Sequence, residues 1–243
     1  YCGISNIRLW KRSFEKYHLT QTPENGFGET PLKKYRRHIF LLHPNKVVIY
    51  DELEANEKVR WDWLLHSPVK FDINPAASIL TTVNKEKGFS SVVQLFCEQE
   101  AAITQTDKYA APPNHADAQR GEDFTDPWSL TASFGPSRNN RILTIIQVEA
   151  DGRQAVQIMR EGNTFQCGEW VIEAELNAKR PGRLYIRNSR NNAVFSYGDK
   201  KPEINGELYS CKEKDDSVLF HSVNGEWTVQ EMGDQRVQTM GKW

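Results

Sequence analysis

Apolar and polar residues alternate along much of the chain with a period of two, which is typical of β-strands. In residues 58–65 the apolar positions are Val59, Trp61, Trp63 and Leu65. Polar residues at the other positions are Lys58, Arg60 and Asp62. Because successive side chains of a strand point to opposite faces of its sheet, we predict a half-buried strand here.

A second segment, residues 170–177, repeats this alternation. The positions expected to face the core are Trp170, Ile172, Ala174 and Leu176. The positions expected to point outward are Glu173, Glu175 and Asn177. Four other segments are apolar at successive positions: residues 38–42, 47–50, 92–96 and 142–148. Short runs of this kind, rich in Val and Ile, predict central strands that are buried on both faces.

Turn-forming residues separate the predicted strands. Asn224-Gly225 lies between Val218–Val223 and Trp227–Met232, and both turn residues tolerate a positive φ, so these segments predict a β-hairpin. The short charged stretch of residues 53–58 is interpreted as another turn. No apolar stripe with helical spacing extends beyond three turns. The fold class is therefore all-β, an antiparallel β-sandwich built from large sheets.

The domain organisation leaves two alternatives. We expect residues 1–150 to form the sandwich, and predicted strands become shorter and turns denser after Val148. Residues 151–243 are then either further hairpins of the same sandwich or a smaller second β domain at the C-terminal end. Residues 104–126 show no periodicity and contain a Pro-Pro pair, so we predict a long surface loop, which is usually functional or mobile.

Composition narrows the class of protein. Of the 243 residues, 38% are hydrophobic and 26% charged, so intrinsic disorder and fibrous folds are excluded. No apolar run approaches the ~18 residues of a membrane span. The chain begins at Tyr1 without a leader, and we expect it to be a piece of a longer protein. The four cysteines (Cys2, Cys97, Cys167 and Cys211) have no zinc-finger spacing, and we expect most to be buried apolar residues. Disulfide pairing stays open.

Charge is unevenly distributed along the chain. Residues 1–40 contain eight Lys and Arg against three Glu, a net charge of +5, and the other 203 residues carry −6, which gives −1 in total. Basic residues interleaved with aromatic rings can grip an acidic polymer. The candidates for polyanion binding are Arg8, Trp10, Arg12, Lys33, Lys34, Arg36 and Arg37. The alternative is a solvated strand edge that Lys and Arg protect against aggregation. No nucleic-acid motif is present, and nucleic acid is not the expected partner.

No catalytic or metal-binding pattern emerges from the residues. The chain has no GxSxG, Walker, GxGxxG or HExxH motif. His115-Ala116-Asp117, in the predicted loop, is the nearest approach to a site. We interpret His38 and His66 as structural imidazoles with satisfied hydrogen bonds. The paired carboxylates Asp51 and Glu52 alternate faces of a strand, so they do not face one sugar bond.

One part of the chain carries a family resemblance. Residues 35–55 (YRRHIFLLHPNKVVIYDELEA) lead into residues 59–67 (VRWDWLLHS). Together they resemble the β-sheet domain of heparinase II/III-like polysaccharide lyases, in which a strand ending near a proline precedes an apolar-Tyr-Asp motif and a strand of the type W-x-L-H. Residues 126–131 (DPWSLT) look like a later part of the same domain.

The resemblance implies a function and a partner domain. Such lyases join an N-terminal α/α toroid to C-terminal β-sheet layers, and cleave uronic-acid polysaccharides of glycosaminoglycan or alginate type by β-elimination. Their catalytic residues come largely from the toroid. The catalytic and metal motifs of the family are missing here, so no catalytic residue, metal ligand or cofactor is assigned. Arg36, Arg37, Asp51 and His66 match the family as scaffold positions.

The expected partners are an acidic polysaccharide and the toroid of the same protein, and the expected location is secreted or periplasmic. Two alternatives stay open. One is a non-catalytic carbohydrate-binding or structural β-sandwich. The other is a complete enzyme of unrecognised type that uses the His115 loop.

Overall fold

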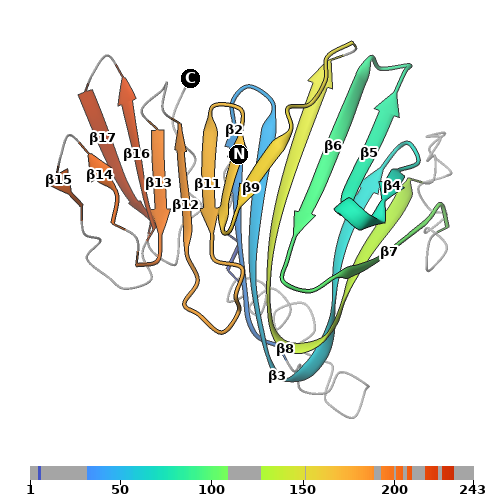
Figure 1. Ribbon diagram of the computed structural model, residues 1–243, viewed down its shortest axis with the longest axis horizontal. Coiled ribbons are helices and arrows are strands. Elements are labelled where there is room, and N and C mark those ends of the chain that lie inside the picture. Colours follow the sequence, from blue (N-terminus) through green and yellow to red (C-terminus); the bar gives the residue numbers. More distant parts are fainter. Residues whose placement is uncertain are drawn as a thin grey trace, which may run out of the picture.

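The fold is made of antiparallel β-sheets, as the alternation predicts. The computed structural model describes residues 5–6, 32–108, 127–150, 152–188, 193–199, 201–204, 207–209, 217–223 and 226–232. These residues form an eight-stranded sheet, a seven-stranded sheet and a two-stranded hairpin. Helical structure within these ranges is limited to the 3₁₀ turn Pro75–Ala77. The predicted all-β class is confirmed (Figure 1).

The larger sheet comes from the first part of the chain. Its strands are β1 (Ser5–Asn6), β2 (Leu32–Leu42), β3 (Lys46–Ser67), β4 (Asp72–Asn74), β5 (Ile79–Asn84), β6 (Phe89–Phe96), β7 (Ala101–Thr106) and β8 (Trp128–Ala150). They are ordered β1-β2-β3-β8-β6-β5-β4, and β7 pairs with β8 beside this path. The four apolar runs lie in β2, β3, β6 and β8, which are interior strands of the sheet, as predicted. Burial on both faces is not complete, because Leu41 is 60% and Val148 42% exposed.

The smaller sheet comes from the second part. Its strands are β9 (Ile158–Glu161), β10 (Thr164–Cys167), β11 (Trp170–Ala174), β12 (Leu184–Asn188), β13 (Ala193–Tyr197), β16 (Ser217–Val223) and β17 (Glu226–Met232). They are ordered β17-β16-β13-β12-β11-β10-β9, so neighbours follow chain order, except that β14 and β15 intervene in the sequence between β13 and β16. The short strands β14 (Glu203–Ile204) and β15 (Glu207–Leu208) pair with each other. Pairing of β16 with β17 confirms the predicted hairpin, whose turn lies outside the described residues.

Two long strands, β3 and β8, are strongly bent, so that the larger sheet folds back on itself. They contain 22 and 23 residues and pair along most of their length, and Figure 1 shows both curving back at its lower edge. The register shifts between Glu54 and Val59 and again before Trp61, which marks a β-bulge. The predicted turn at residues 53–58 is therefore wrong. Its polar residues are exposed at a bulge that bends β3 without ending it.

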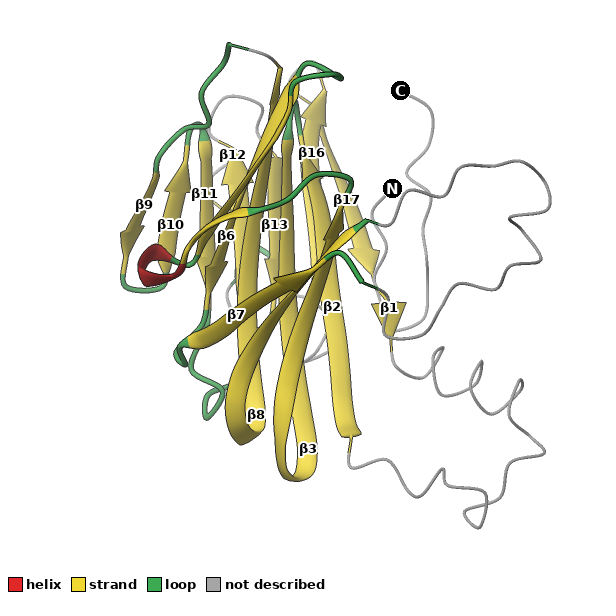
Figure 2. Cartoon of the chain, turned by 90° about the vertical axis from the view of Figure 1, so that its right-hand side faces the viewer, coloured by secondary structure: helices red, strands yellow, loops and turns green. Residues whose placement is uncertain are grey.

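The bend encloses a first hydrophobic core. One arm of β8 pairs with β6 and the other with β7, which runs obliquely to the other strands in Figure 2. The buried residues between the arms include Leu53, Trp61, Trp63, Leu80, Leu95, Leu130, Phe134 and Ile142. Trp61 and Trp63 are only 9% and 4% exposed, which confirms the alternation predicted for residues 58–65.

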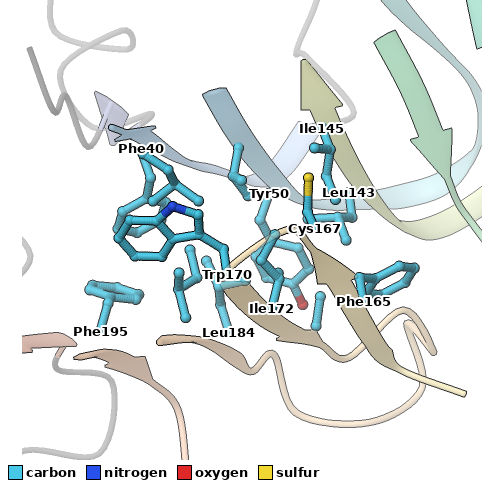
Figure 3. Packing of buried hydrophobic residues seen from close by; sticks show 14 of the residues in the cluster. Phe40, Tyr50, Leu143, Ile145, Phe165, Cys167, Trp170, Ile172, Leu184 and Phe195 are labelled. Atoms are coloured by element: carbon cyan, nitrogen blue, oxygen red, sulfur yellow. The ribbon is translucent and has the colours of Figure 1, made fainter. Parts of the chain in front are cut away.

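A second hydrophobic core lies between the two sheets (Figure 3). It is filled from the larger sheet by Phe40, Val48, Tyr50, Leu143 and Ile145, and from the smaller sheet by Phe165, Cys167, Trp170, Ile172, Leu184 and Phe195. The Tyr50 hydroxyl donates a hydrogen bond of 2.7 Å to the carbonyl of Glu175. Residues on both sides of position 150 thus share one core.

The segment 170–177 needs one correction. Its apolar stripe is buried as predicted, but Glu175, expected to point outward, is only 4% exposed. Its carboxylate accepts hydrogen bonds from the Asn163 side chain at 3.1 Å and the Asn177 backbone at 2.9 Å. These donors compensate for the loss of water around the buried carboxylate. The Glu175 side chain thus holds residues 163 and 177 beside the end of β11.

Other predictions fall partly outside the described residues. The predicted loop of residues 104–126 begins later than expected, because β7 continues to Thr106, and residues 109–126 are not described. Cys167 is buried and free and Cys97 is partly buried and free, whereas Cys2 and Cys211 lie outside the described residues. In the described part of the chain, no helix has the length and apolar character needed to cross a membrane.

Replacing Trp63 by Ala tests the bent sheet. Trp63 is buried inside the bend, and we expect the Trp63→Ala change to lower the free energy of unfolding by about 3–5 kcal/mol through the cavity it leaves. The control is Leu64→Ala, on the opposite face and 58% exposed, which should change it by no more than about 0.5 kcal/mol. Urea unfolding measures both. Equal losses in the two variants would contradict the assignment of faces.

Candidate functional site

The basic cluster of residues 33–37 lies in the first half of β2, beside the acidic residues of β3. In the register of the two strands, Arg36 lies opposite Glu52 and Arg37 opposite Asp51. Since side chains alternate, the cluster is divided between the two faces of the larger sheet. Lys34 and Arg36 face the smaller sheet, and Arg37 faces the other way.

Arg37 is held by an ion pair on its own face. Its Nε and Nη2 donate hydrogen bonds of 2.6 and 2.9 Å to the two carboxylate oxygens of Asp51, which is 1% exposed. The guanidinium also lies 5.5 Å from the ring centroid of Tyr35. A guanidinium engaged by both oxygens of a carboxylate has little capacity left for a ligand. Arg37 is therefore a structural residue in this arrangement.

Glu52 is the centre of the other face. It is 1% exposed, and its Oε2 accepts hydrogen bonds from Arg141 Nη1 and, at 3.1 Å, from Lys34 Nζ. Burial by itself would raise the pKa of Glu52, but the charges of Arg141 and Lys34 outweigh burial and hold this pKa below its ordinary value. Glu52 is therefore an anion inside the sandwich, at the end where β2 begins.

The loop between β11 and β12 packs directly on this carboxylate. Arg141 Nη2 donates a hydrogen bond of 3.1 Å to the carbonyl of Arg180. A Cβ atom at Gly182 would overlap the Glu52 carboxylate, so this close approach of the backbone requires glycine. Figure 1 shows the loop toward the lower edge of the molecule, where β3 and β8 also bend.

Arg36 is anchored to the smaller sheet by Tyr197. Its Nη1 donates a hydrogen bond of 2.6 Å to the Tyr197 hydroxyl, and the guanidinium lies 5.3 Å from the ring centroid. Burial and the nearby Glu52 carboxylate raise the pKa of Tyr197 above its ordinary value. Tyr197 therefore remains a neutral phenol at physiological pH, and its hydroxyl serves as an acceptor for Arg36.

His38 lies behind this group, in an aromatic environment. Its ring centroid is 4.4 Å from that of Tyr197, and the rings of Phe40, Tyr50 and Phe195 are next to it. His38 is buried as expected, but the expectation of a satisfied imidazole is wrong. Neither ring nitrogen has a hydrogen-bond partner among the described residues. Burial lowers the pKa of His38 to about 3, so the ring is neutral.

The remaining candidates are dispersed. Lys33 is 65% exposed and lies 3.7 Å from a Glu54 oxygen. His66 is exposed at the end of β3. Arg8, Trp10, Arg12 and His115 lie outside the described residues, and their predicted roles stay predictions. In the described ranges, no group of three or more His, Cys, Asp and Glu side chains could hold a metal ion.

Sequence reasoning missed Glu52, Arg141 and Tyr197 as members of this site. Arg141 gives the clearest signal in retrospect, because a cation directly before the apolar run 142–148 needs a buried counter-charge. Which carboxylate supplies it depends on the pairing of β3 with β8, which places Glu52 opposite Arg141.

Comparison with known proteins adds no family. No protein-family model matches the chain, and no curated protein matches its sequence significantly.

Neutralising Glu52 tests the buried charge. Glu52→Gln leaves Arg141 buried without its counter-ion, and we expect the free energy of unfolding at pH 7 to fall by about 3–5 kcal/mol. Glu54→Gln, in the exposed pair with Lys33, should cost no more than about 1 kcal/mol.

The same variant tests how stability depends on pH. Because the pKa of Glu52 is lowered on folding, the contribution of Glu52 to stability is present above the unfolded pKa of 4.5 and is lost as the pH falls below it. The stability of Glu52→Gln should therefore depend less on pH below 4.5 than that of the natural chain, as acid titrations of chemical unfolding would show.

His38→Phe tests the buried imidazole. The unfolded chain binds a proton at His38 below pH 6.5, whereas the folded chain resists protonation until about pH 3. The natural chain therefore loses stability from pH 6.5 downward, and at pH 5 this loss is about 2 kcal/mol. His38→Phe removes the titration, so we expect its stability relative to the natural chain to rise by that amount between pH 7.5 and pH 5. A constant difference across this range, measured by urea unfolding, would contradict the neutral buried state.

Proposed function

We propose that this chain is the β-sheet region of a heparinase II/III-like polysaccharide lyase. The enzyme would cleave a uronic-acid polysaccharide, of glycosaminoglycan or alginate type, by β-elimination. The observation that carries the proposal is the place of the similar segment. Residues 35–55 form the hairpin of β2 and β3, and residues 59–67 continue β3 around the bend of the larger sheet. The resemblance thus covers two neighbouring strands of the larger sheet.

The charges of β2 suit a chain that contacts an acidic polymer. Elimination requires that the uronate carboxylate be neutralised while a base removes the proton at C5 and an acid assists the leaving oxygen. In the proposal, the base and acid belong to an N-terminal α/α toroid of the same protein. The present chain forms one wall of the substrate cleft and supports the toroid. A secreted or periplasmic location follows from the same analogy.

A second candidate is a non-catalytic carbohydrate-binding or structural β-sandwich. It is favoured by the exposed position of Lys33 together with the partly exposed Lys34 and Arg36, since this surface could bind an acidic polymer without any catalytic partner. The two candidates differ in one measurable property. If the chain is a lyase region, the gene product that contains it depolymerises polyuronates. If the chain is a binding module, that activity is not required.

The test compares the chain with the natural gene product that contains it. Both are incubated with heparin, hyaluronan and alginate, and unsaturated uronate is followed by its ultraviolet absorbance. We expect product from the gene product and none from the present chain. Failure of the gene product on every polyuronate would refute the lyase proposal. Sustained turnover by the present chain, lost in His115→Ala, would instead support a complete enzyme that uses the loop.

A further inference from the structure

The loop between β11 and β12 brings a second set of cations to the basic cluster of β2. Lys179, Arg180 and Arg183 lie in this loop, more than 140 positions along the chain from Lys33, Lys34 and Arg36. The Arg141 bond to the Arg180 carbonyl and the contact of Gly182 with Glu52 fix the loop to the larger sheet beside Lys34. These six cations are called the basic end below.

At the basic end, the cations are more exposed to solvent than the carboxylates that pair with them. The side chains of Lys33 and Arg180 are 65% and 68% exposed, and Lys179 is also exposed. Lys33 and Arg180 form ion pairs of 3.7 and 3.6 Å with Glu54 and Glu175, whose side chains are only 32% and 6% exposed. Glu52, the partner of Lys34, is 1% exposed. A polymer that approaches this surface therefore meets ammonium and guanidinium groups first, with the compensating carboxylates beneath them.

The loop is held in place before any ligand arrives. The Lys179 backbone donates a hydrogen bond of 2.9 Å to the Asn177 side chain, and the Arg180 backbone donates one of 3.0 Å to the Asn177 carbonyl. The backbone of Asn177 in turn donates to the buried carboxylate of Glu175. A preformed loop loses less conformational entropy on binding than a flexible one, so modest contacts suffice.

We propose that the basic end is one anion-binding surface, which takes the sulfate or carboxylate groups of an acidic polysaccharide through Lys33 on β2 and Lys179 and Arg180 on the loop. The polysaccharide class rests on the proposed function, whereas the binding surface itself rests on the charges described above. Lys34 and Arg36 are positioning residues, because Glu52 and Tyr197 already engage them. The loop cations are the new element, because sequence reasoning gave Lys179 and Arg180 no role.

The experiment measures binding of the present chain to immobilised heparin and to alginate at low and at high salt. We expect salt-sensitive binding, and we expect the Lys179→Ala, Arg180→Ala double variant to bind about five- to tenfold more weakly, as the loss of two exposed ionic contacts implies. The matched control is Lys85→Ala, Lys87→Ala, which removes two exposed cations from the turn after β5 and should leave the affinity unchanged. Thermal unfolding of each variant checks that the fold is intact.

Other outcomes overturn the inference. Equal affinities for the loop variant and the control variant would show that overall charge, and not the basic end, governs binding. Equal retention on neutral dextran would exclude an anion site, and stronger binding to duplex DNA than to any polysaccharide would exclude the proposed ligand class. None of these results depends on turnover, so the lyase proposal would stand or fall separately on the depolymerisation assay.

Discussion

A single buried carboxylate, Glu52, sets the geometry of one end of this protein. Transfer of a charge from water into the space between two sheets is expensive unless cations and hydrogen-bond donors replace the water. Arg141 from β8 and Lys34 from β2 supply them, and the Arg141 guanidinium also donates to the carbonyl of Arg180 in the loop between β11 and β12. The need to pair one charge therefore joins three strands and a loop that are distant in the sequence.

This pairing also determines which cations are available to a ligand. Arg37 is committed to Asp51 on the far face, while Lys34 and Arg36 are held by Glu52 and Tyr197. The four basic residues of the segment 33–37 thus include side chains held in structural contacts, and few of their charges are accessible. In the proposed binding surface, the loop after β11 adds the exposed cations Lys179 and Arg180 to Lys33 of β2. Structural and binding roles are combined at one end of the sandwich because each buried carboxylate fixes cations around it.

Local patterns predicted the strands well and their continuity poorly. The alternation of Trp61 and Trp63 with polar residues reflects burial on one face, which is a local property of the chain. The polar residues between Glu54 and Val59 also look like a turn locally, yet β3 continues through them. Pairing with β8 provides hydrogen-bond partners on both sides of the bulge, and this pairing involves residues about 80 positions away. Glu175 shows the same limit, because its position in the alternation predicts an outward side chain while the Asn163 and Asn177 partners that cover it come from neighbouring loops.

The amino-acid sequence by itself determined the all-β class, the faces of most strands, the hairpin of β16 and β17, and the concentration of basic residues near β2. These features depend on side-chain period and on turn residues, which act over a few positions. Tertiary structure alone decided that β3 and β8 bend around a core of their own, that Glu52 pairs with Arg141, and that the loop after β11 lies against these two residues. Such features require contacts between segments that are distant in the sequence. A buried charge finds its counter-ion, and a strand edge its partner, only when the sheets pack together.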